Sequence, residues 1–250
     1  MFSTALALLR TPVHATIFPY PWATTLHASR ISMVFHTNLR NTNSRLSWGA
    51  HLLGFLLMCW GGSLTSHLLL SLPPPQLYAL GPWINYSAVH LLFTVLFHYF
   101  PIPDPSIHKH SSLPSRWTSP LPLLVTSPLF HFILGATASA GGGLLGGTFS
   151  LWTPNWQFST PPPLRTGVWG FWSTLDIWAG GVVAVTYGIL AGHPAFLPLR
   201  TSFAAKPLPV VNAQTTAAAI MVVLFGLRVA AMASKAAKAP VAAKEKVKTQ

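Results

Sequence analysis

The chain has very few acidic residues and few charges of either sign. Its acids are Asp104, Asp176 and Glu245, and charged side chains make up 7% of the 250 residues. A soluble domain carries about 25% charged residues, so this sequence cannot cover the surface of one. Acid–base and nucleophilic catalysis would also find few partners here. We therefore expect a membrane protein that has no catalytic residues and is not an enzyme.

Cysteine is nearly absent as well. The single Cys59 excludes an internal disulfide and a zinc site built from cysteines. Hydrophobic residues make up 51% of the chain, and the mean hydropathy is +0.48. The net charge of +12 comes from Lys and Arg gathered in the ends and connections, as expected where a protein meets anionic headgroups. Membrane lipids are the expected partner, and nucleic acid is not.

Five apolar segments are long enough to cross a hydrocarbon core of about 30 Å as helices. Proline-rich connections separate them, as at Leu72–Pro75 and Pro101–Pro105, because proline lacks an amide donor and stops a helix. The predicted fold is all-α, a polytopic transmembrane helical bundle over residues 48–232. Its five expected spans are Trp48–Leu72, Trp83–Phe100, Pro128–Trp152, Thr166–Leu190 and Val211–Met232.

Both ends of the chain are basic. Residues 1–47 contain Arg10, Arg30, Arg40 and Arg45 and no acid. Three interpretations stay open for them: a cleaved targeting segment, with a mitochondrial membrane as the alternative location, a weak first membrane helix, or a disordered terminus. Residues 233–250 are predicted to form a solvated basic tail.

The charge distribution argues for a further crossing. Five spans place the two basic ends on opposite sides of the membrane, whereas positive charge prefers the cytoplasmic side. One added crossing between Phe100 and Pro128 would bring both ends to that side. The apolar run in this region, Pro120–Val125, is too short to span. The sequence therefore predicts a missing or degenerate element there.

The glycine-rich stretch Ala140–Phe149 lies inside one of the apolar spans. A phosphate-binding loop would need a strand before it and a Lys-Ser/Thr pair after it, and both are missing. Small residues recur every four positions, a pattern that lets helix backbones approach closely: Gly135, Ser139, Gly143 and Gly147. Each glycine also weakens a helix by roughly 1 kcal/mol. Tight packing and a helix break at 141–143, with carbonyls facing an ion, both stay open.

A second glycine pair occurs in the first span. Gly62 lies eleven residues before Pro73, and Gly143 lies eleven residues before Pro154. Two glycine-broken helices at matching distances from a proline are a weak signal of an inverted repeat, as in transport proteins built from two related halves.

These residues resemble the trimeric intracellular cation channels of the endoplasmic and sarcoplasmic reticulum. Trp48–Pro75 resembles the second helix of that family, with its Gly-Gly break and proline stop, and Ile84–Ile102 resembles the third. Gly135–Gly143 is similar to the glycine-broken fifth helix, and Trp152–Phe158 to the connection that follows it. The resemblance covers about residues 48–228.

The resemblance implies a homotrimer of seven-helix subunits, each with its own pore for potassium ions, in the endoplasmic reticulum or another endomembrane. Gly61, Gly62, Gly142 and Gly143 would then occupy kinks beside the pore. The family's fourth helix carries a Lys-Glu-Val motif and basic contacts to a phosphoinositide headgroup, and no segment of this chain matches it. No other cofactor is expected.

Asp176 is the one acid within a predicted span. An ionised carboxylate at membrane depth costs at least about 2.5 kcal/mol unless it is paired or hydrated. It could attract a cation in a hydrated path or pair with Arg228 of the last span. Arg228 could instead extend to the headgroups.

Histidines lie on several of the apolar spans. No acid stands at ligand spacing from them, so we expect each to bond to a neighbouring helix or to lie at the membrane interface, and we expect no metal site: His51, His67, His90, His98 and His131. The expected function is passive potassium flow across an endomembrane. The alternatives are a non-conducting membrane scaffold of the same fold and, third, a histidine-based membrane metalloenzyme.

Overall fold

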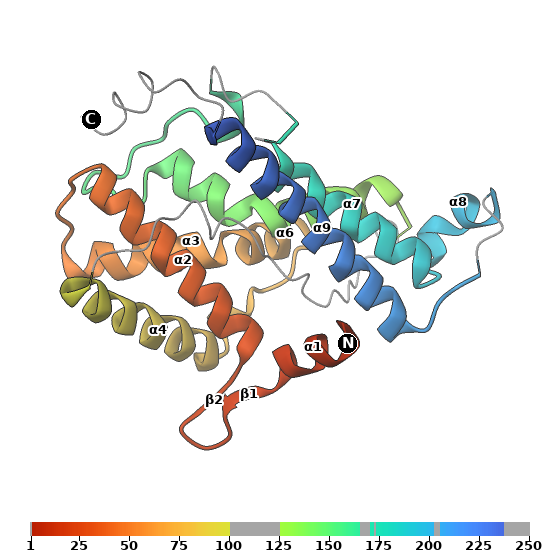
Figure 1. Cartoon of the computed structure of the whole chain (residues 1–250), viewed down its shortest axis with the longest axis horizontal. Helices are drawn as coiled ribbons and strands as arrows, with labels where there is room; N and C mark the ends of the chain where they lie inside the picture. The colour runs from red at the N-terminus through yellow and green to blue at the C-terminus, as the bar shows by residue number, and fades with distance from the viewer. Residues whose placement is uncertain (1, 101–125, 166–170, 173, 203–205, 238–250) are drawn as a thin grey trace.

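The computed structural model describes residues 2–100, 126–165, 171–172, 174–202 and 206–237. Within them the chain is mostly helical, and the long helices pack side by side as a bundle (Figure 1). The predicted all-α class is therefore confirmed in its main part. A two-stranded hairpin near the N-terminus is an addition that the sequence analysis did not predict.

The N-terminal segment is built into the bundle. Helix α1 (Phe2–Arg10) leads into an antiparallel hairpin of β1 (Pro12–His14) and β2 (Phe18–Pro21), and α2 (Trp22–Asn41) follows directly. Ala28, Ile31 and Phe35 on one face of α2 are buried against α3 and α4. The sequence had left three interpretations open for residues 1–47, and a helix of 20 residues lies there.

Three long helices follow the predicted spans closely: α3 (Trp48–Leu69), α4 (Leu80–Tyr99) and α6 (Pro128–Phe149). The hydroxyl of Ser47 accepts a hydrogen bond from the backbone amide of Ala50, and that of Ser127 caps α6 in the same way. Serine before a helix, with proline at its first position in α6, is a common start signal. Short 3-10 turns, η1 (Pro75–Leu77) and η3 (Pro162–Leu164), lie in the proline-rich connections.

The fourth predicted span is the least accurate. Helix α7 (Leu175–Leu190) has 16 residues and begins well after Thr166. It turns through 92° into η4 (Pro194–Phe196) and α8 (Leu197–Ser202), because Gly192 adopts a positive φ of 76° and Pro194 starts a new turn. Within the described residues, four helices are long and apolar enough to cross a membrane, or up to five if the bent pair counts as one span. Five clear spans are therefore not confirmed.

The last described helix, α9 (Val210–Ala237), runs beside α7 (Figure 1). It continues into the first residues of the predicted basic tail. The rest of that tail and residues 101–125, where the charge argument placed a further crossing, lie outside the described residues.

Two buried apolar clusters hold the bundle together. One joins α2, α3 and α4, and the other joins α7 and α9. Helix α6 lies between α3 and α7, since its glycines contact both helices. Large apolar side chains are also exposed on the outside, as a lipid environment allows: Leu91, Leu92 and Val95 on α4, and Val211, Val222, Val223 and Leu227 on α9. The fold is that of an integral membrane protein.

Candidate functional site

Three of the four glycines singled out from the sequence, Gly61, Gly62 and Gly142, lie at the crossing of α3 and α6. A Cβ atom placed on Gly61 would lie 2.8 Å from the carbonyl oxygen of Gly141 and 2.8 Å from the Cα of Gly142. A Cβ on Gly62 would contact the carbonyl of Ala138. Real Cβ atoms do not come this close to backbone, so only glycine fits here. The crossing is a direct contact of two backbones.

The helices do not break at these glycines. Helices α3 and α6 each run as continuous α-helix through Gly61, Gly62, Gly142 and Gly143. Of the two interpretations left open by the sequence, the structure follows tight packing and shows no break at 141–143. Where the glycines have no side chain, the backbone of the other helix fills the space. Each helix keeps its own backbone hydrogen bonds. Gly143 is exposed and faces away from α3, with nothing within 4 Å of its Cβ position. It is not part of the crossing.

A second backbone contact joins α6 to α7. A Cβ on Gly135 would contact the carbonyl of Gly180, and one on Gly180 would contact the carbonyl of Gly135. The sequence analysis noted Gly135 but not Gly180 or Gly181, although the pair "GG" inside an apolar span was a signal of the same kind. Helix α6 thus carries one glycine contact on each side.

The intramembrane charges pair with each other. A guanidinium nitrogen of Arg228 (α9) donates to the carboxylate of Asp176 at 2.8 Å. Asp176 is the second residue of α7, where the helix dipole favours an anion, and its side chain is 40% exposed, against 9% for Arg228. Arg30 of α2 also interacts electrostatically with both groups. Of the two interpretations left open for Asp176, the structure shows the ion pair with Arg228. Asp176 lies at the start of α7, whereas the sequence placed it inside a span.

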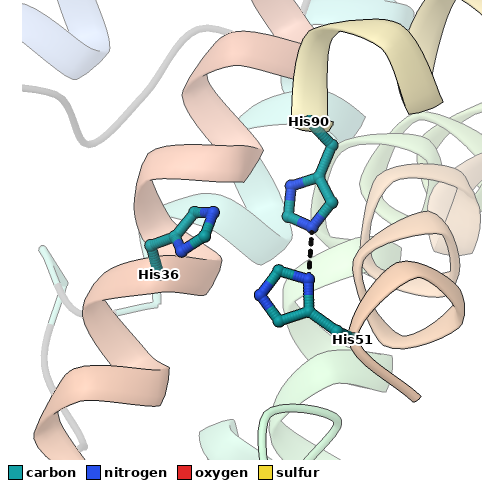
Figure 2. A group of neighbouring side chains, drawn as sticks. All are labelled: His36, His51 and His90. Atoms are coloured by element: carbon teal, nitrogen blue, oxygen red, sulfur yellow. Dashed lines mark hydrogen bonds between the residues drawn. The ribbon is translucent and has the colours of Figure 1, made fainter. Parts of the chain in front are cut away.

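Three histidines from three helices form a cluster. His36 (α2), His51 (α3) and His90 (α4) each offer one ring nitrogen, and these atoms all lie within 4.8 Å of one another. Figure 2 shows the rings turned toward a common centre, with His90 Nε2 and His51 Nδ1 3.0 Å apart. The cluster is buried or half-buried. It lies near the end of the bundle where α2 ends and α3 begins.

Hydrogen bonds fix the orientation of these rings. His90 Nδ1 lies 2.8 Å from the hydroxyl of Ser32, and His36 Nε2 lies 3.1 Å from the hydroxyl of Thr94. Phe55 stacks on His90 with the ring centroids 3.8 Å apart. The predicted hydrogen bonding between helices is present for His51 and His90. His36 was missed, because it lies in the N-terminal segment that the sequence did not assign to the bundle.

The other histidines on the predicted spans lie apart from this cluster. His67 bonds to the carbonyl of Ser63 in its own helix, and His131 packs against His193. The spacing of His36, His51 and His90 in the sequence could not predict that they lie together, since they come from separate helices. The sequence offered no metal site, and the structure instead provides a group of residues that could hold one.

Comparison of the chain with protein-family models, with curated proteins and with solved structures finds no match. The fold and the side-chain arrangement described above therefore carry the functional argument, together with the resemblance of the glycine-bearing segments.

Proposed function

We propose that this protein is a passive channel for monovalent cations, potassium above all, in the endoplasmic reticulum or another endomembrane. As in the intracellular cation channels that the sequence resembles, it would work as a homotrimer and carry counter-charge. A phosphoinositide headgroup is part of the same proposal only through that resemblance, since the motif that binds it in the family has no counterpart here.

The observation that supports the proposal best is the contact between Gly61 and Gly62 of α3 and Gly141 and Gly142 of α6. The paired glycine-bearing helices are the best motif of the resemblance, and their glycines lie about 80 residues apart in the sequence. Transport proteins built from two related halves commonly place a pair of glycine- or proline-interrupted helices at their centre. In this protein the two glycine-bearing helices do meet, although both run without a break.

A non-conducting scaffold of the same fold is the second candidate. It is favoured by the unbroken course of α3 and α6 and by the direct backbone contact, which leaves no room for an ion at the crossing. The pairing of Asp176 with Arg228 also neutralises the only acid in the described part of the chain.

Single-channel recording separates the two candidates. The purified chain is reconstituted in planar bilayers with potassium on both sides, and its oligomeric state is measured in parallel. The test variant is Gly142→Ala, whose Cβ would contact the carbonyl of Met58 and push α3 away. Gly143→Ala is the matched control, because it adds the same methyl group on the exposed face of the same helix.

A potassium current that is altered or abolished in Gly142→Ala and kept in Gly143→Ala supports the channel. Folded trimers of the wild-type protein that pass no current support the scaffold instead. A current unchanged in both Gly142→Ala and Asp176→Asn would contradict a pathway that depends on the crossing or on the intramembrane charge.

A further inference from the structure

We propose that His36, His51 and His90 bind one divalent transition-metal ion that fastens α2 to α3 and α4. The three rings supply the ligand type that zinc, copper, nickel and cobalt ions accept in proteins. This inference does not depend on the channel proposal, since the cluster belongs to different residues from the glycine crossing and the Asp176–Arg228 pair.

The ring positions are close to those of a metal site. Zinc binds imidazole nitrogen at about 2.0–2.1 Å, which places two ligands of a tetrahedral site about 3.4 Å apart. His90 Nε2 and His51 Nδ1 are already 3.0 Å apart. The ring nitrogens of the three residues lie within 4.8 Å of one another. Side-chain movements that shorten these distances by about 1.4 Å at most would bring the third nitrogen to the separation of a tetrahedral site.

The hydrogen bonds leave lone pairs available for the ion. The hydroxyl of Thr94 donates to the carbonyl of His90 at 2.8 Å, so it accepts from His36 Nε2–H. The other nitrogen of His36 then carries a lone pair. His90 Nδ1 lies 2.8 Å from the hydroxyl of Ser32. In the tautomer that carries its proton on Nδ1 and donates to this hydroxyl, His90 Nε2 has the lone pair.

The contact between His90 and His51 is the one that the ion would replace. In the absence of metal, His51 Nδ1–H donates to His90 Nε2. Two nitrogens that share one proton at 3.0 Å can share a cation instead, once the proton of His51 moves to its other nitrogen or is released. The hydroxyls of Ser32 and Thr94 then act as outer partners that hold the rings, as such groups commonly do in metal sites.

The cluster is suited to a structural role. Within the described residues no carboxylate joins the three histidines, so this part of the chain offers the site no carboxylate base for metal-assisted hydrolysis. The ligands come from three helices, and Phe55 covers one face of His90. An ion held by all three would therefore restrain the packing of α2, the least apolar of the long helices, against its neighbours.

Metal binding by the full chain tests the proposal. The protein is purified without a histidine tag, in detergent or nanodiscs, stripped with a chelator and titrated with Zn²⁺ and with Co²⁺. We expect one Zn²⁺ per chain, visible Co²⁺ bands typical of tetrahedral nitrogen coordination, and a rise in the unfolding temperature with metal. Loss of an outer partner of a metal ligand typically weakens metal binding by about 10- to 100-fold. Loss of a ligand itself, in H36Q, H51Q or H90Q, should therefore weaken binding by at least about 100-fold.

Two further variants keep the result interpretable. Ser32→Ala removes only an outer partner and should weaken binding by about 10- to 100-fold while the fold is kept. His67→Gln, which changes another histidine of α3 outside the cluster, should bind as tightly as the wild type. Folded wild-type protein that takes up no metal would overturn the proposal, and so would binding that H36Q, H51Q and H90Q all retain.

Discussion

The glycine contact between α3 and α6 makes a prediction about stability that follows from distances alone. In Gly141→Ala the new Cβ would lie 2.6 Å from the Cα of Gly62 and 2.8 Å from its amide nitrogen. Ordinary contact begins at 3.4 Å, so the methyl group is about 0.8 Å too close. The atoms it meets belong to the backbone and cannot rotate away. The two helices must therefore move apart.

The cost can be compared with a control in the same helix. Gly143→Ala adds the same methyl group where nothing lies within 4 Å. Both variants gain the same helix propensity of about 1 kcal/mol, which cancels when they are compared. Overpacking of a well-packed contact costs about 1–3 kcal/mol. Gly141→Ala should therefore have a free energy of unfolding about 1–3 kcal/mol lower than that of Gly143→Ala.

Steric trapping or unfolding by a denaturing detergent, with both variants in the same micelles, measures this difference. Circular dichroism before unfolding checks that each variant is helical and folded. If Gly141→Ala is as stable as Gly143→Ala, the backbones of α3 and α6 are not in contact at this point, and the packing described for the crossing is wrong.

Two further predictions concern the charges. Arg228→Met should lower the free energy of unfolding by about 1–2 kcal/mol, less than for a fully buried pair because Asp176 is 40% exposed. Adding Asp176→Asn should restore most of this loss. A double variant less stable than Arg228→Met contradicts the pairing. Glycosylation acceptor sites placed in residues 101–125 and in the tail should show the tail on the same side as Arg40 and Arg45, and a glycosylated, lumenal tail would refute the extra crossing.

Composition and local signals determined much of the fold. Long apolar runs bounded by proline predict α3, α4, α6 and α9 to within a few residues, because a membrane forces every backbone group to bond within its own helix. The same rule failed for α2, which is polar enough to look like a terminus and is helical because its buried face packs on α3 and α4. It also overestimated α7 at its start, because the helix begins at Leu175 and the predicted span began at Thr166.

The site was only partly accessible from the sequence. The sequence pointed to Gly61, Gly62, Gly135 and Gly142, which do lie at helix contacts, but also to Gly143, which does not, and it missed Gly180. Whether they break a helix or pack two helices together depends on the partner surface, and here the surface of α6 fits α3 without a break. The pairing of Asp176 with Arg228 was one of two open alternatives, because a lone charge in a span must find a partner or water.

The sequence by itself determined that this is a helical membrane protein whose spans carry clustered glycines, since hydropathy and residue size act locally along the chain. Only the tertiary structure decided that α3 and α6 meet face to face, that His36, His51 and His90 share one place, and that Arg228 reaches Asp176. Asp176 and Arg228 lie 52 positions apart in the sequence, and Gly61 and Gly141 lie 80 apart. Such contacts depend on how helices cross, which no local pattern specifies.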